Sequence, residues 1–382
     1  MKPAAAQPYR WAMSSNLNWR RAMLALTSMF ALGCTSISVQ AQTTAPANPT
    51  STMDCGADAA CLRRAYAGPS STWPRPTVDK GVHWQELGPR PVLPAQAPQL
   101  AALGEKLFHD LRLSKNQDIS CASCHTPHLG FADGRRLAVG HEGKAGTRHT
   151  PGLWGVAFVK NLMWDGRAGQ LEIQALLPLL HPSEMAADLP TLLERLNRHT
   201  DYPERFAKVF KGQSSVTPSK LGAALASYQR TLEAPRSRFD DFIEGRRDAV
   251  NDQELRGLHL FRTQARCMNC HSGPQLTQQE FHQIGMSQLR RRAEDIGRMA
   301  VTAKLEDEGA MRTPSLRGIA RTAPYMHNGI MPSLRGVLEL YNAGIPQPRS
   351  SATAIPPPSP LIQPLRLKIE DIQALEAFLA VL

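Results

Sequence analysis

Two short stretches, Cys121-Ala-Ser-Cys124-His125 and Cys267-Met-Asn-Cys270-His271, repeat one pattern and decide how this chain folds. Each is C-x-x-C-H, the attachment signature of a c-type haem. The spacing has a chemical reason, because two thiols on one turn form thioethers with the two haem vinyl groups and the next residue turns its imidazole toward the iron. His125 and His271 are therefore the predicted proximal ligands. The alternatives are a redox dithiol and a zinc site, but neither requires the trailing histidine in both copies.

Length and composition set the class of protein. The chain has 382 residues, which is enough for two domains with buried cores. Hydrophobic residues make up 42% and charged residues 20%, a globular composition that excludes global disorder, collagen and a coiled coil. The net charge of +11 is a moderate basic excess that suits an acidic protein partner. No extended block of Lys and Arg appears, so nucleic acid is not an expected partner.

The N-terminal residues carry the pattern of an export signal. Arg20 and Arg21 precede an apolar run over residues 22–33, which is too short to span a bilayer but has the length of a signal-peptide core. Residues 39–41 resemble a cleavage site, so residues 1–41 are a predicted signal peptide and the periplasm is the predicted location. A rival cut before Cys34 loosely resembles a lipoprotein signal and would anchor the chain through that cysteine.

A polar segment separates this signal from the globular body. Residues 42–96 are rich in Pro, Thr, Ala and Gln, which predicts an irregular arm with little core of its own. Cys55 and Cys61 lie six residues apart in this arm. Because an exported chain meets an oxidising compartment, we expect a disulfide between them.

Helical periodicity dominates the rest of the chain. Apolar residues recur at helical spacing in five segments: 100–108, 188–198, 217–232, 251–261 and 369–382. Thr217 and Asn251 have the sequence context of helix N-caps. No run of alternating strand residues appears, so the predicted class is mainly α. We expect two cytochrome c-like haem domains with long loops, at 97–235 and 236–382, after the N-terminal arm.

Further blocks of sequence surround the two motifs. They are Leu103-Gly-Glu-Lys-Leu-Phe108, Ser120-Cys-Ala-Ser-Cys-His125, Trp164-Asp-Gly-Arg-Ala168, Pro182-Ser-Glu-Met185, Arg312-Thr-Pro-Ser-Leu-Arg317 and Pro324-Tyr-Met-His-Asn-Gly329. Together they resemble the bacterial di-haem cytochrome c peroxidase and MauG superfamily over residues 97–382. The resemblance implies a peroxide-reacting haem on the first motif and an electron-transfer haem on the second, with the N-terminal arm outside the match.

In the first domain the resemblance implies the catalytic residues. Glu184 matches the family's distal acid and Gln174 its polar companion, and a carboxylate over an open iron can move a proton between the two peroxide oxygens. Trp164 matches the tryptophan that the family places between its haems, where an indole can carry an electron or a hole. His141 matches the histidine that caps the resting first iron in many members. The nearby alternatives are His128 and His149.

The second domain departs from the peroxidase pattern at its sixth iron ligand. Fourteen residues after His327 the peroxidases carry a Met, whereas this sequence has Tyr341, the residue type that MauG-like members use. An anionic phenolate favours ferric iron and a thioether raises the haem potential, so we expect a second haem of low potential. The substitute thioether candidates are Met326 and Met331.

The resemblance also implies a calcium ion between the haems. Thr322 and Pro324 match two of its contributors, but His149 stands where the family has Asn. Imidazole is a poor ligand for a hard cation. We therefore expect two covalently bound haem c groups, with calcium as a weakened expectation.

Three functions compete. The first is a peroxidase that reduces hydrogen peroxide to water with electrons from a small soluble redox protein, either a cytochrome c or a cupredoxin, and Glu184, Gln174 and Trp164 favour it. The second is a MauG-like enzyme that oxidises side chains of a partner protein, which Tyr341 favours. The third is a non-catalytic di-haem electron carrier, which leaves the segment around Glu184 unexplained. We rank the peroxidase first, and a homodimer is an assembly that the resemblance allows.

Overall fold

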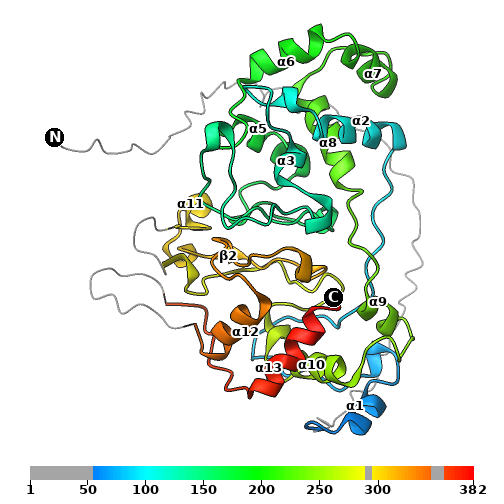
Figure 1. Cartoon of the computed structure of the whole chain (residues 1–382), viewed down its shortest axis with the longest axis vertical. Helices are drawn as coiled ribbons and strands as arrows, with labels where there is room; N and C mark the ends of the chain where they lie inside the picture. Colours follow the sequence, from blue (N-terminus) through cyan, green and yellow to red (C-terminus); the bar gives the residue numbers. More distant parts are fainter. Residues whose placement is uncertain (1–54, 289–294, 346–356) are drawn as a thin grey trace, which may run out of the picture. The chain divides into compact units, whose positions relative to one another are not determined.

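The computed structural model describes residues 55–288, 295–345 and 357–382 (Figure 1). The predicted signal peptide over residues 1–41, its cleavage site and Cys34 lie outside the described residues. The described chain is mainly helical, which confirms the predicted class. Among its helices, none is long and apolar enough to cross a bilayer.

The elements follow one another with long connections. The α-helices are α1 (Ala59–Ala65), α2 (Pro98–Phe108), α3 (Cys121–Cys124), α4 (Leu171–Gln174), α5 (Leu177–Leu180), α6 (Leu189–Arg198), α7 (Tyr202–Val209), α8 (Pro218–Gln229), α9 (Arg238–Ile243), α10 (Asp252–Arg262), α11 (Met299–Thr302), α12 (Leu334–Asn342) and α13 (Ile369–Leu379). Two short strands, β1 (Phe281–His282) and β2 (Met311–Arg312), pair antiparallel. The predicted helix starts are confirmed, because Thr217 caps α8 and Asn251 forms a capping box at α10.

The buried apolar side chains form two main clusters. The first draws its residues from α2, α6, α7 and α8, with Cys121 packed against it. The second draws on α9, α10, α12 and α13, with Cys267 packed against it. Each C-x-x-C-H segment therefore lies against a helical core of its own.

The N-terminal arm packs onto the second cluster. Its buried side chains there are Cys55, Leu62, Tyr66, Trp73 and Leu87. The predicted disulfide between Cys55 and Cys61 is confirmed. Arg262, at the end of α10, is fully buried beneath the arm, where its guanidinium lies over the ring of Trp73 and pairs with Glu86. The arm thus has helix α1 but relies on the core of the second cluster.

Each cluster contains a close helix crossing at a glycine. Figure 1 shows α2 beside α8 and α10 beside α13. An added Cβ at Gly104 of α2 would overlap the carbonyl oxygen of Ala224 in α8, and one at Gly257 of α10 would overlap that of Ala374 in α13. Only a residue without a side chain lets two helix backbones approach so closely. The two clusters therefore use the same packing arrangement.

Gly257→Ala is expected to lower the free energy of unfolding by about 1–3 kcal/mol, because the added methyl group must push α10 and α13 apart. Urea denaturation of the haem-loaded protein measures the change. Gly169→Ala is the control, since an added Cβ there meets no atom within 4 Å. An unchanged denaturation midpoint in Gly257→Ala would show that this crossing tolerates a side chain.

Candidate haem site

Both C-x-x-C-H segments line one cavity of about 710 Å³. The motif residues in its wall are Cys121, Cys124, His125, Cys267, Cys270 and His271. Much of the remaining wall is apolar, with Phe108, Met185 and Leu375 among its residues. A largely apolar cavity with a few placed polar groups is the usual character of a cofactor site.

The two proximal histidines are held in the same way. Nδ1 of His125 lies 2.6 Å from the carbonyl oxygen of Phe131, and Nδ1 of His271 lies 3.0 Å from that of Leu276. A hydrogen bond from Nδ1–H to a carbonyl fixes the tautomer and leaves Nε2 free for a metal. Burial lowers the pKa of both imidazoles, that of His271 to about 4, so both are neutral at pH 7. Neutral imidazole is the form that binds iron.

The motif thiols are half-buried and protonated. Burial raises the pKa of Cys121 and Cys267 to about 12 and that of Cys124 and Cys270 to about 11. A redox dithiol needs a lowered thiol pKa, so these values argue against that alternative. Two thiols and one neutral imidazole per motif, all on one cavity, fit two covalent haem c groups.

Glu184 and Gln174 line the cavity with the first motif. Gln174 ends α4, and its side-chain amide donates to Sδ of Met163 at 3.6 Å. Glu184 follows α5, and its charge contributes, after burial and Asp133, to the raised pKa of Cys124. The Glu184 side chain is 33% exposed. Its carboxylate is therefore open to solvent while it lies on the cavity wall.

His181 is a site residue that the sequence motifs do not predict. It lines the cavity, and its Nδ1 lies 3.6 Å from Oε1 of Glu184. The backbone N–H of Ser183 donates to the same Nδ1 at 3.3 Å. The sequence feature that could have identified His181 is its position three residues before Glu184, in the loop that follows α5. The loop after α5 therefore places an imidazole beside the carboxylate.

The three histidines considered as caps of the first iron lie in different places. His141 is buried, but its ring does not line the cavity, and its Nε2 lies 3.4 Å from Oε1 of Glu142. His128 is exposed and also off the cavity wall. His149 does line the cavity, with its Nδ1 2.7 Å from the carbonyl oxygen of Arg135. Ligation by His141 stays a prediction, and it requires the turn at residues 141–143 to move.

Two of the three side chains considered as the sixth ligand of the second haem line the cavity. Tyr341, on α12, lines the cavity, and burial raises the pKa of its phenol, with Cys270 and Cys267 acting in the same direction. A phenolate at this position therefore needs a neighbouring cation such as ferric iron. Met326 also lines the cavity, whereas Met331 does not.

One sequence segment occurs twice, once after each C-x-x-C-H motif. We call the parts of the chain before and after residue 235 its first and second half. Residues 148–166 and 311–329 share Thr-Pro near the start and Met-ring-Asp/Asn-Gly at the end, in the same register. The ring is the indole of Trp164 in one copy and the imidazole of His327 in the other. The preceding residues, Met163 and Met326, both have a φ of +70°. The two copies thus follow the same backbone path at the point that presents the ring.

Backbone hydrogen bonds join the two copies next to Trp164. The backbone N–H of Arg312 donates to the carbonyl of Trp164 at 2.8 Å, and that of His149 donates to the carbonyl of His327 at 2.7 Å. The rings of Trp164 and His327 lie 6.4 Å apart between centroids. The indole N–H donates to the carbonyl of His149 at 2.9 Å. Trp164 therefore stands at the junction of the two halves, on the wall of the cavity that both motifs share.

The residues expected at the calcium site also line the cavity. Thr322 and Pro324 are both on its wall. His149, which stands where the family pattern has Asn, already directs its Nδ1 to a backbone carbonyl. In the part of the chain that the structure describes, no group of three or more His, Cys, Asp or Glu side chains is arranged to hold a metal ion. A calcium ion here would take most of its ligands from other oxygen atoms, such as backbone carbonyls, side-chain hydroxyls or amides, and water.

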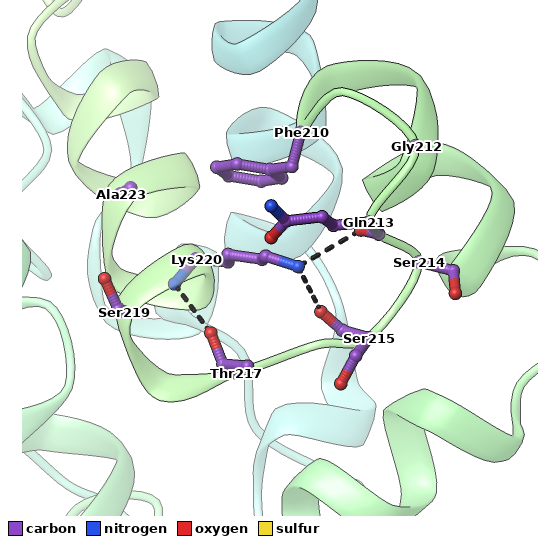
Figure 2. A pocket seen from close by; sticks show the side chains of 9 residues that line it. All are labelled: Phe210, Gly212, Gln213, Ser214, Ser215, Thr217, Ser219, Lys220 and Ala223. Atoms are coloured by element: carbon purple, nitrogen blue, oxygen red, sulfur yellow. Dashed lines mark hydrogen bonds between the residues drawn. The ribbon is translucent and has the colours of Figure 1, made fainter.

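A second pocket lies at the connection between α7 and α8 and is lined by residues between positions 210 and 223 (Figure 2). Lys220 is the charged residue in its lining, and its Nζ donates to the carbonyl oxygens of Gln213 and Ser215. The same Nζ lies 5.5 Å from the ring centroid of Phe210. Its charge is already engaged, and none of the predicted site residues lines this pocket.

The helical fold and the cavity that two C-x-x-C-H motifs share are those of a di-haem c-type protein. The family model for di-haem cytochrome c peroxidases matches residues 98–248, and a RoxA-like, cytochrome c-like model matches residues 310–342. The methylamine utilization protein MauG of Methylophilus methylotrophus is 36% identical over 259 residues, which cover 67% of this chain and 76% of that protein. The chain belongs to the di-haem cytochrome c peroxidase and MauG family.

Two further comparisons agree. Cytochrome-c peroxidase IdrP1 of Pseudomonas sp. (strain SCT) is 33% identical over 332 residues, covering 78% of this chain and 85% of that protein. A crystal structure of a MauG-like protein associated with microbial copper homeostasis superposes with a TM-score of 0.68 at 28% identity, covering 80% of this chain and 95% of that chain. The predicted family is thereby confirmed, and with it an enzyme of the oxidoreductase class.

Proposed function

We propose that this protein is a periplasmic peroxidase that reduces hydrogen peroxide to water. The observation that carries the proposal is the position of Glu184 and Gln174 on the wall of the cavity that Cys121, Cys124 and His125 also line. A plain electron carrier has no use for a carboxylate and an amide on the wall of its haem cavity, because its electrons enter and leave without bond making. The third function considered from the sequence is therefore the weakest.

The residues around the first motif have separate roles. A haem bound there would supply an iron that binds peroxide and takes up electrons. Glu184 is placed to take the proton from one peroxide oxygen and return it to the departing oxygen. Gln174 can hold the peroxide by hydrogen bonding. Each peroxide consumes two electrons and two protons and yields two waters, and the protons reach Glu184 from solvent past His181, 3.6 Å away.

Electrons are proposed to enter at the second motif and to cross to the first through Trp164. The indole N–H is held by the carbonyl of His149 at 2.9 Å, so the ring keeps its proton and its orientation while charge passes. The neighbouring ring of His327 has its pKa lowered to about 4 by burial and is neutral at pH 7. A neutral neighbour opposes positive charge on the indole less than an imidazolium would.

A steady-state assay with hydrogen peroxide tests the proposal. The reduced donors are a high-potential cytochrome c, a cupredoxin and a small donor of low potential. We expect peroxide-dependent oxidation of at least one of them. Protein that carries two haems and oxidises none of the three donors would contradict the peroxidase and favour the electron carrier.

A second candidate function rests on Tyr341. In the MauG-like alternative, electrons are withdrawn from side chains of a partner protein instead of from a soluble donor. The position of Tyr341 beside Cys267 and Cys270 supports a phenolate ligand, which favours ferric iron and disfavours electron entry from a high-potential donor. The partner would then be a protein substrate rather than a cytochrome c or cupredoxin.

Tyr341→Met is expected to raise the potential of the second haem and to increase turnover with a high-potential cytochrome c, because a neutral sulfur favours ferrous iron. Redox titration and the near-infrared absorption spectrum measure the change. The wild type should show no charge-transfer band from a thioether to iron. A wild-type spectrum of His/Met ligation would instead make Met326 the ligand. It would favour the cytochrome c peroxidase over the MauG-like enzyme.

The remaining proposals concern setting and assembly. Export by the predicted signal peptide at residues 1–41 would bring the chain to the periplasm, where haem c is attached, with anchoring through Cys34 as the alternative. One calcium ion between the haems and a homodimer remain proposals. Metal analysis and light scattering of the haem-loaded protein decide them.

A further inference from the structure

Five arginines line the haem cavity. Four of them form ion pairs: Arg148 with Asp165 and Asp295, Arg167 with Asp165, Arg266 with Asp79, and Arg317 with Asp240. The fifth, Arg312, forms no ion pair within residues 55–288, 295–345 and 357–382. Four arginines of this cavity have an acidic partner and Arg312 has none among the described residues. A general shortage of acids around the cavity therefore does not explain the difference.

The hydrogen-bond contacts of the Arg312 side chain do not replace the missing ion pair. Its Nε lies 3.5 Å from the carbonyl oxygen of Met163, and its Nη1 lies 3.4 Å from that of Thr313. Both distances are beyond the usual range of N–H···O hydrogen bonds. Its Nη2 donates no hydrogen bond to the described residues. Burial lowers the pKa of the guanidinium to about 10, with no acid opposing the shift, yet the group stays charged at pH 7.

The Arg312 side chain is half-buried on the cavity wall, where a bound haem would remove further solvent from its charge. Burying an ion without a partner is unfavourable, and proteins avoid it by pairing. The planar fork of a guanidinium matches a carboxylate, with which it forms two parallel hydrogen bonds. Each haem c brings two propionate carboxylates into the cavity that Arg312 lines. We propose that Arg312 binds a haem propionate at the junction of the two halves.

The position of Arg312 fits this role. It belongs to β2 in the second half, but its backbone N–H holds the carbonyl of Trp164 and its Nε faces the carbonyl of Met163, both in the first half. In the repeated segment the equivalent position is His149, whose Nδ1 is hydrogen bonded to a carbonyl. The paired propionate and guanidinium therefore occur at one of the two equivalent positions, directly beside the proposed route through Trp164.

Pairing has an electrostatic consequence for electron transfer. A bare guanidinium next to Trp164 would oppose positive charge on the indole, and a bare propionate would stabilise ferric iron. Together they cancel, which keeps the route usable and the potential of that haem higher than a free propionate would allow. The inference rests on haem binding at the two motifs, which measurement of the mass of the haem-loaded protein tests separately.

Redox titration of haem-loaded Arg312→Gln, followed by absorption at each haem, tests the proposal. We expect the potential of one haem to fall, because its propionate loses the neutralising cation. Arg312→Lys should lower the same potential by less, since an ammonium keeps the charge but not the two parallel hydrogen bonds. Arg256→Gln is the matched control, because Arg256 pairs with Asp371 and does not line the cavity. It should leave both potentials unchanged.

Equal potentials in the wild type and Arg312→Gln would overturn the proposal, whatever happens to turnover. Should Arg312→Gln fail to mature with two haems, Arg312→Lys decides, and unchanged potentials in that variant would overturn it as well. The measurement involves no peroxide. Its outcome is therefore independent of whether Glu184 moves protons or whether the enzyme acts on peroxide at all.

Discussion

Glu184→Gln is expected to keep the absorption spectra of both haems and to lose peroxide turnover by about 10²-fold or more, the usual scale of general acid-base catalysis. The amide has the shape of the carboxylate but cannot accept a proton and return it. Because Glu184 lines the cavity and is one-third exposed, the substitution leaves the packing of both cores untouched. Steady-state peroxide consumption with a saturating donor measures the loss.

Glu194→Gln is the matched control for this variant. Glu194 lies on α6, pairs with Arg198 and is absent from the cavity wall, so turnover should equal that of the wild type. Undiminished turnover in correctly folded Glu184→Gln would remove Glu184 from the mechanism. The hypothesis of a non-catalytic electron carrier would then be favoured over both enzyme hypotheses.

The double variant Cys267→Ala with Cys270→Ala is expected to carry one covalent haem, whereas the wild type carries two through denaturation. The thioether bonds are covalent, so a chain without the two thiols of the second motif cannot retain that haem once it unfolds. Mass spectrometry of the denatured protein, matured in a periplasm, counts the groups. Electron entry from a donor should be lost with the second haem.

Removing the cysteines of the arm provides the control. Cys55→Ala with Cys61→Ala breaks the disulfide but touches neither motif, so both haems should remain. A wild-type mass with fewer than two haems in properly matured protein would contradict the assignment of both motifs. The proposed function and the proposed role of Arg312 would then both be wrong, because both depend on the two haems.

Much of the site was predictable because its patterns are local. Two thiols and a histidine act from one turn of chain, so C-x-x-C-H needs no knowledge of the fold. The caps at Thr217 and Asn251 bond to groups three residues away, and the disulfide of the arm joins cysteines six residues apart. The roles of Glu184, Gln174 and Trp164 came from resemblance to a family, and they stay predictions until the variants are measured.

Other features were beyond local patterns. The ring of His141 lies off the cavity although its sequence position suggests an iron ligand, because the turn at 141–143 directs it toward Glu142. His181 joins Glu184 through the particular path of the loop after α5. Composition predicts an arm with little core of its own between residues 42 and 96, but not that its buried side chains complete the second cluster.

The sequence by itself predicted the two haem attachment sites, and it determined the helical class and the disulfide of the arm, since each depends on spacing along a short piece of chain. Only the tertiary structure decided that Trp164 meets His327, that Gly104 and Gly257 lie at helix crossings, and that Arg312 is left without a carboxylate among the described residues. The physical reason is that these contacts join segments far apart in the chain. Their geometry is set by the simultaneous packing of both cores, and an ion's partner can be known only when every neighbour is in place.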